Sequence, residues 1–109
     1  MSPMLLGQLE QLVLLATLRL EEQARAIDIR TLLNDETGEA FSRGSVYAAL
    51  SRLTDKGFLT WHTEDAVPDR GGIPRRRFEV TPDGLTAIRD ARHMVVRLSQ
   101  GLDQILAEG

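Results

Sequence analysis

Apolar side chains recur at helical spacing along the chain and divide it into helical segments separated by polar turns. In the segment that begins at Ser42 and ends at Gly57, Val46, Leu50 and Leu53 follow one another at spacings of four and three. This spacing places them on one side of a helix, facing a core. Ser42 is suited to cap the start of this helix, and Gly57 can adopt the left-handed conformation that ends it.

Two further helices are predicted before this segment. Residues 7–20 are apolar on nearly every side, so their helix must be covered on more than one side, either by this chain or by another copy. Residues 26–37 carry apolar side chains on one inward face, and Gly38 is suited to close their helix.

A β-hairpin is predicted after the Ser42 helix. Residues 58–63 are rich in β-branched and aromatic side chains, and residues 76–81 alternate so that Phe78 and Val80 share a face. Residues 64–75 contain two prolines and two glycines and are predicted to form a long loop that carries Arg70 and Arg75. A helix, a short turn and a hairpin form the winged version of the helix-turn-helix, in which the helix enters the major groove and the hairpin touches the flanking backbone or minor groove.

The C-terminal part predicts one long helix that starts at Thr81, Pro82 and Asp83, with Thr as cap, Pro in the first turn and Asp favoured by the helix dipole. A helix of about 27 residues would run roughly 40 Å, longer than so small a domain can cover, so we expect its apolar seam to meet a second copy. The alternative is that the helix folds back on the first helix of its own chain. Gly101 lowers helix propensity by about 1 kcal/mol and allows a bend. The residues assigned to dimerisation are Ile88, Val95, Leu98, Leu102 and Ile105.

Together these elements predict a mainly α fold with a small β-hairpin, in the α+β class. Residues 1–81 form a winged helix-turn-helix and residues 82–109 a dimerisation helix, in one compact unit. At 109 residues the chain has the length of one domain, and it contains no cysteine, which excludes disulfides and thiolate metal sites. It begins without the basic region of a secretory signal, and its apolar runs are too short to span a bilayer, so we expect a cytoplasmic protein without membrane contact.

The net charge of −3 is unfavourable for DNA binding, but the charge is unevenly distributed. Residues 1–39 carry a net charge of −4, residues 40–80 carry +2 and residues 81–109 carry −1. Because charges are screened within about 8 Å at physiological salt, the positive region can contact phosphate while the rest stays acidic. The excess is small, so we expect modest electrostatic affinity that depends on dimerisation and specific contacts.

The exposed side of the Ser42 helix combines small residues with cations and has no carboxylate before Asp55. Small residues allow close approach to a duplex, hydroxyls suit phosphate oxygens, and guanidinium groups can bind guanine or bridge phosphates. The alternative is an ordinary amphipathic helix with a solvated basic face. On the hairpin, alternation groups Arg75 with Arg77 and places Arg76 on the face of Phe78. The residues assigned to DNA contact are Ser42, Arg43, Ser45, Tyr47, Arg52, Lys56, Arg70, Arg75 and Arg77.

From about residue 6 to residue 102 the chain resembles the PadR family of bacterial transcriptional regulators, in its short form with one C-terminal helix. The resemblance rests on the order and spacing of four segments, which are LGQLEQLVLLA at residues 6–16, SRGSVYAALSRL at residues 42–53, PDRGG at residues 68–72 and FEVTPDG at residues 78–84. It implies a homodimeric winged-helix protein, usually a repressor, that binds an inverted-repeat operator near its own gene or a neighbouring transporter gene. Many relatives release DNA when a small-molecule effector binds.

The resemblance also bears on individual residues. In the family the Tyr at position 47 is a hallmark near the DNA backbone, whereas packing between helices is its alternative role here. The chain departs from the family at Arg25, where a Tyr is common, and at Arg77, where an aromatic residue is common. Trp61 is expected either in the core of the wing or at a dimer cavity, where it would stack on an aromatic effector.

No catalytic or cofactor motif occurs in the sequence, and His62 and His93 lack a second ligand at metal spacing. We therefore expect neither an enzyme nor a metal or cofactor site. A winged-helix module that binds another protein, with a merely solvated basic face, is the alternative to a DNA-binding regulator.

Overall fold

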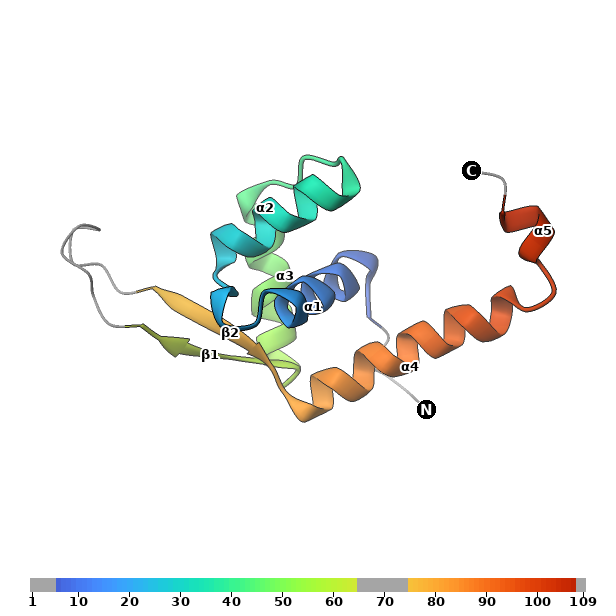
Figure 1. Ribbon diagram of the computed structural model, residues 1–109. Helices are drawn as coiled ribbons and strands as arrows, with labels where there is room; N and C mark the ends of the chain where they lie inside the picture. Colours follow the sequence, from blue (N-terminus) through green and yellow to red (C-terminus); the bar gives the residue numbers. More distant parts are fainter. Residues whose placement is uncertain (1–5, 65–74, 108–109) are drawn as a thin grey trace.

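A computed structural model of the chain describes residues 6–64 and 75–107 (Figure 1). Three helices are followed by a two-stranded hairpin and a C-terminal helical region. The elements are α1 (Gln8–Leu20), the 3-10 turn η1 (Glu21–Gln23), α2 (Ala26–Thr37), α3 (Arg43–Asp55), β1 (Leu59–Thr63), β2 (Arg76–Val80), α4 (Pro82–Ser99) and α5 (Asp103–Leu106). This architecture confirms the predicted α+β winged helix.

Helix α1 lies at the centre and packs against α2, α3, α4 and β2 (Figure 1). Its buried side includes Val13 and Leu14, which are fully inaccessible to solvent. From α3 the predicted residues Val46, Leu50 and Leu53 join the same core. The core is therefore aliphatic and is assembled around α1, which fixes how α3 is presented to solvent.

The helix boundaries follow the expected capping chemistry. The hydroxyl of Ser42 accepts a hydrogen bond of 3.0 Å from the N–H of Ser45, and the hydroxyl of Thr81 accepts one of the same length from Gly84. Gly38 and Gly57 adopt φ of 74° and 81° at the ends of α2 and α3. These local signals are confirmed because each satisfies backbone groups that a helix end leaves unpaired.

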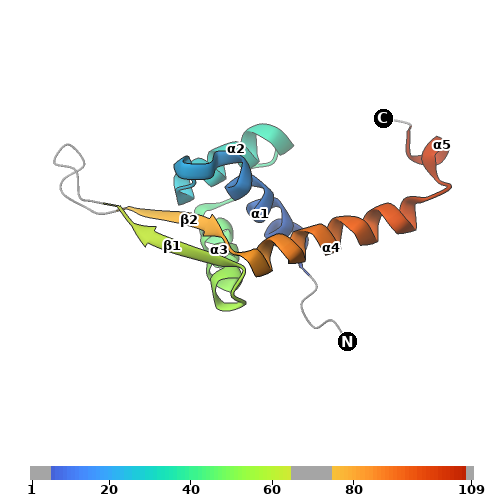
Figure 2. The same ribbon diagram turned by 60° about the horizontal axis from the view of Figure 1, so that its bottom comes forward.

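Strands β1 and β2 pair antiparallel, with Leu59 opposite Val80 and Thr63 opposite Arg76. The segment before α2 runs beside β2, because the N–H of Phe78 donates to the carbonyl of Ala24 at 2.8 Å. The middle of β2 is thereby attached to the body of the protein. The two strands extend away from α4 (Figure 2).

The C-terminal region differs from the single long helix predicted above. Helix α4 ends at Ser99, Gly101 adopts φ of 82°, and α5 is a separate short helix. Glycine takes this conformation without steric cost, so the chain turns here instead of continuing the heptads. Ile88 is also corrected, because it is 2% exposed and belongs to the core of its own chain.

The second half of α4 extends beyond the body formed by α1, α2, α3 and the hairpin (Figures 1 and 2). Val95 is 60% exposed and Leu98 is 82% exposed. Both continue, at heptad spacing, the face that buries Ile88 and Ala91 nearer the start of the helix. The apolar stripe thus runs from the core into solvent. None of the described helices is long and apolar enough to cross a membrane.

Candidate nucleic-acid interface

Helix α3 separates a buried apolar side from an exposed polar side. Val46, Ala49, Leu50 and Leu53 are at most 2% exposed and anchor the helix to α1 and α2. The opposite side carries two arginines, two serines, one alanine and one tyrosine. These exposed residues are Arg43, Ser45, Tyr47, Ala48, Ser51 and Arg52.

The first turn of α3 orders several of these side chains. The hydroxyl of Ser42 donates to that of Ser45 at 2.9 Å, so both predicted hydroxyls lie together at the start of the helix. The guanidinium of Arg43 lies over the ring of Tyr47, 5.7 Å from its centroid. Such a contact restrains the arginine while its donors stay exposed. Tyr47 borders a small cavity with Ile27 of α2 and is 48% exposed, so it lies near α2 and also faces solvent.

A groove of about 600 Å³ lies between α2, α3 and the hairpin. Arg76 borders it and stacks over Trp61, with the guanidinium carbon 4.2 Å from the ring centroid. The indole is 37% exposed, so it lies at the groove and not within the core of the wing. Residues lining the groove include Arg25, Tyr47, Ser51, Trp61, Arg75 and Arg76.

The arginines of the hairpin border two different hollows. Arg75 precedes β2 and lines the same groove as Arg76, whereas Arg77 lines a different cavity with Glu21 and Glu22. Arg75 and Arg77 are half-buried and Arg76 is exposed. The grouping of Arg75 with Arg77 for DNA contact stays a prediction. Arg70 lies outside the described residues.

Arg25, at the start of α2, joins the hairpin to the helical body. Its Nε and Nη2 donate to the carboxylate of Glu64 at 2.8 and 3.0 Å, and its Nη1 lies 3.5 Å from Asp28. The hydrogen bonds to Glu64 raise the pKa of the Arg25 guanidinium above its usual value. A tyrosine, common here in the family, could not form this bidentate pair. The departure at position 25 thus gives the wing an ionic attachment to α2.

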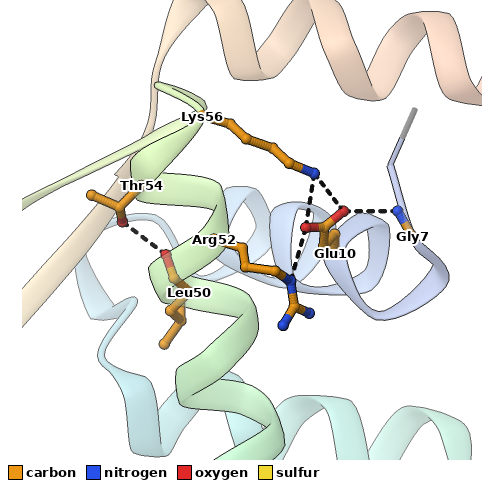
Figure 3. Close-up of polar contacts among 6 residues, drawn as sticks. All are labelled: Gly7, Glu10, Leu50, Arg52, Thr54 and Lys56. Carbon is orange, nitrogen blue, oxygen red and sulfur yellow. Dashed lines mark hydrogen bonds and ion pairs between the residues drawn. The ribbon is translucent and has the colours of Figure 1, made fainter. Parts of the chain in front are cut away.

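Glu10 of α1 is the most buried charged group among the described residues, with a side chain 5% exposed. Its carboxylate accepts hydrogen bonds from the N–H of Gly7 at 2.8 Å, Nε of Arg52 at 3.2 Å and Nζ of Lys56 at 3.0 Å (Figure 3). Burial by itself raises the pKa of this carboxyl, but these hydrogen bonds outweigh it, so the pKa lies below its ordinary value of 4.5. Glu10 is therefore ionised and holds two cations of α3.

Arg52 and Lys56 differ in which of their hydrogen-bond donors the contacts with Glu10 leave free. The side chain of Lys56 is 25% exposed and its ammonium is bound to both carboxylate oxygens. The side chain of Arg52 is 52% exposed and donates through Nε, while its two terminal nitrogens point away from Glu10 (Figure 3). Arg52 therefore retains outward donors, whereas the charge of Lys56 is compensated inside the protein.

The sequence analysis missed Glu10, Arg25 and Arg76 as parts of this region. One signal for Glu10 was present, because it occupies the same helical stripe as Val13 and Thr17, which are both buried. A carboxylate in such a stripe needs a cationic partner. Its partners come from more than 40 positions later, which no local pattern identifies.

The two histidines, His62 and His93, were expected at the surface or at an interface. Within the part of the chain that is described, no group of three or more His, Asp or Glu side chains is arranged to hold a metal ion. His62 instead lies 3.1 Å from Glu79 on an exposed face of the hairpin.

The helices, the exposed basic side of α3 and the hairpin beside it define a winged helix-turn-helix protein with an additional C-terminal helix. Residues 14–90 match the family described as the transcriptional regulator PadR-like family, and the chain belongs to this family. Its members are transcriptional regulators and not enzymes, as the sequence analysis expected. No curated protein matches the chain.

Solved structures share the fold at low sequence identity. A PadR-like regulator from Bacillus cereus is 23% identical with a TM-score of 0.70, and the match covers 99% of both chains. A PadR family regulator from Eggerthella lenta is 24% identical with a TM-score of 0.68, covering 91% of this chain and 84% of the other. PadR of Bacillus subtilis, solved in complex with operator DNA, is 22% identical with a TM-score of 0.63, covering 77% of this chain and 47% of the other.

Proposed function

We propose that the protein is a homodimeric regulator of transcription that binds duplex DNA, with α3 in the major groove and the hairpin on the flanking backbone. The exposed side of α3 carries the proposal, because it combines Arg43 and Arg52 with small side chains and has no carboxylate before Asp55. Small residues permit close approach to base edges, and arginine forks suit guanine or phosphate. The operator complex of the Bacillus subtilis relative supports this function.

Within this proposal the contacts to DNA come from two elements. We assign base or phosphate contacts on α3 to Ser42, Arg43, Ser45, Tyr47 and Arg52. On the hairpin we assign backbone contacts to Arg75 and Arg76, which border the groove beside α3. Lys56 and Arg77 are left out, because one is bound to Glu10 and the other lies beside Glu21 and Glu22.

The resemblance to the family supports the finer parts of the proposal. We infer that the protein acts in the cytoplasm as a repressor of its own or a neighbouring transporter operon, at an inverted-repeat operator. Release by a small-molecule effector belongs to the same inference. A dimer is required, since an inverted repeat matches a two-fold symmetric pair of α3 helices.

The exposed apolar stripe of α4 supports dimerisation. On α4, Val95 is 60% exposed and Leu98 is 82% exposed. After the turn at Gly101, Leu102 is 40% exposed and Ile105 of α5 is 72% exposed, which adds to the apolar surface at this end of the chain. Apolar side chains grouped in this way favour a protein interface over contact with water. Leu15 and Leu18 of α1, each 39% exposed, add apolar surface on the body. A second copy would cover this stripe.

The dimer is tested by placing a charge in the stripe. We expect Leu98→Glu to run as a monomer in size-exclusion chromatography with light scattering, at concentrations where the parent is a dimer. Burying an unpaired carboxylate in each half of the interface costs several kcal/mol. Thr86→Glu, at an exposed position near the start of the same helix, is the control and should stay dimeric. A dimeric Leu98→Glu variant would refute the assignment.

DNA binding is tested by selecting duplexes from a random library with the purified protein and measuring affinity by gel shift. Replacing Arg43 or Arg52 with Ala should each cost about 1–3 kcal/mol and relax specificity at one position. Arg89→Ala removes an exposed arginine of α4 and should leave affinity within about twofold, because long-range charge effects are screened. If no duplex is enriched, or if both the Arg43 and the Arg52 variant bind like the parent, the basic side is merely solvated and a protein-binding module becomes the better account.

A further inference from the structure

Glu10 is buried in α1, yet its two cationic partners belong to the helix that is proposed to bind DNA. The carboxylate lies 3.2 Å from Nε of Arg52 and 3.0 Å from Nζ of Lys56 (Figure 3). A carboxylate in this position competes with DNA phosphates for the same two side chains. It therefore affects which positive charges of α3 are available to DNA.

The competition has different results for the two cations. Both oxygens of Glu10 accept from Nζ of Lys56, and the lysine side chain is 25% exposed. Moving this ammonium to a phosphate would leave a carboxylate with 5% exposure without one of its partners, which is costly. Lys56 is thus retained by the protein when DNA is present.

Glu10 orients the side chain of Arg52 but does not keep it from DNA. A single donor, Nε, faces Glu10, while the terminal nitrogens point away from it (Figure 3). A guanidinium fixed along one edge loses less conformational freedom when its other donors bind a base or phosphate. The arrangement selects one orientation of Arg52 on the exposed side of α3.

We propose that Glu10 is a positioning residue for DNA recognition, which withholds Lys56 from the phosphates and orients the terminal nitrogens of Arg52 toward the duplex. Its effect is to limit binding that depends only on charge and to favour binding that depends on sequence. The inference rests on the proposed DNA-binding function and adds to it a group that does not touch DNA.

The test is a double-mutant cycle between Glu10 and Lys56, read as the salt dependence of DNA binding. Each phosphate contact makes the negative slope of log K against log salt steeper by about 0.9. Lys56→Met in the parent should leave the slope unchanged, because Lys56 does not contact DNA. Glu10→Gln keeps an acceptor for the N–H of Gly7 but removes the charge, and it should steepen the slope by about 0.9 for each Lys56 released.

In the double variant Glu10→Gln with Lys56→Met, the slope should return to the parent value. Glu10→Gln should also lower the ratio of affinities for the selected duplex and a scrambled duplex by about tenfold, because Arg52 loses its orientation. A purely structural role would alter thermal stability without moving slope and ratio in this pattern.

Several results would overturn the inference. One is a slope of log K against log salt that becomes shallower by about 0.9 or more in Lys56→Met alone, which would mean that Lys56 contacts phosphate in the parent. This variant leaves Glu10 paired with Arg52 and Gly7, so it decides the matter even if Glu10→Gln fails to fold. Another is an unchanged slope and ratio in folded Glu10→Gln. A parent that binds no selected duplex would instead refute the proposed function itself, and the inference would fall with it.

Discussion

A single methyl group at Gly84 should destabilise the fold, because α4 starts in direct contact with the turn before β1. A Cβ at this position would overlap the carbonyl oxygen of Phe58 and lie 3.0 Å from Cγ1 of Val80. The same carbonyl accepts a hydrogen bond of 3.1 Å from the N–H of Thr81. The clash is thus with backbone that is already fixed, and it cannot be relieved by rotating a side chain.

The magnitude follows from three contributions. Overpacking in a closely packed site costs about 1–3 kcal/mol, and weakening the hydrogen bond from Thr81 costs about 1 kcal/mol. The better helix propensity of Ala offsets up to about 1 kcal/mol of this destabilisation. We expect Gly84→Ala to lower the free energy of unfolding by about 2 kcal/mol, which for a domain near this size lowers Tm by roughly 8–16 °C.

Gly44→Ala is the matched control, because it makes the same chemical change in another helix. The nearest atom to a Cβ at Gly44 is the hydroxyl oxygen of Ser42, at 4.0 Å, and the residue is exposed. Without a clash, Ala should stabilise α3 by roughly 0.5–1 kcal/mol. Thermal unfolding is followed by circular dichroism at one protomer concentration, since dimerisation makes Tm depend on concentration. Equal Tm values for the two variants would refute the close approach of α4 to Phe58.

Three further changes test local parts of the structure. Glu21 has φ of 52°, unusual for a residue with a side chain, so Glu21→Gly should raise the free energy of unfolding by about 1 kcal/mol, and a lower urea midpoint would contradict this. Ser42→Ala removes the cap of α3 and should lower the same free energy by about 1 kcal/mol; an unchanged midpoint would argue against the cap. Because the pKa of Glu10 is lowered on folding, its stabilising contribution is present above pH 4.5 and is lost as the pH falls through the lower folded value. The stability difference between the parent and Glu10→Gln should therefore shrink below pH 4.5 in urea titrations, and a constant difference would count against the ionised, hydrogen-bonded carboxylate.

Local signals allowed much of the fold to be predicted from the sequence. The cap at Ser42, the glycines at positions 38 and 57 and the start of α4 at Thr81 each depend on residues within one helical turn. The inward side of α3 follows in the same way from the spacing of its apolar residues. Such features need no knowledge of distant contacts, so a sequence pattern is sufficient.

The features that were missed depend on tertiary contacts. The pairing of Lys56 with Glu10 could not be predicted, because the two residues lie 46 positions apart and meet only once α1 packs on α3. The heptad pattern of the last helix continues through Gly101 in the sequence, but in the structure the backbone turns at Gly101 and Ile88 is buried in the core of its own chain.

The claim that the exposed side of α3 enters a major groove is tested most directly by steric block without a change of charge. Ala48 is exposed in the middle of this side, between the turns that carry Arg43 and Arg52. We expect Ala48→Trp to weaken binding to a selected duplex at least 100-fold in fluorescence anisotropy, with Tm unchanged, because an indole there keeps the helix out of the groove. Thr86→Trp, at the exposed start of α4, should bind like the parent. Parent-like affinity of a folded Ala48→Trp variant would contradict the account.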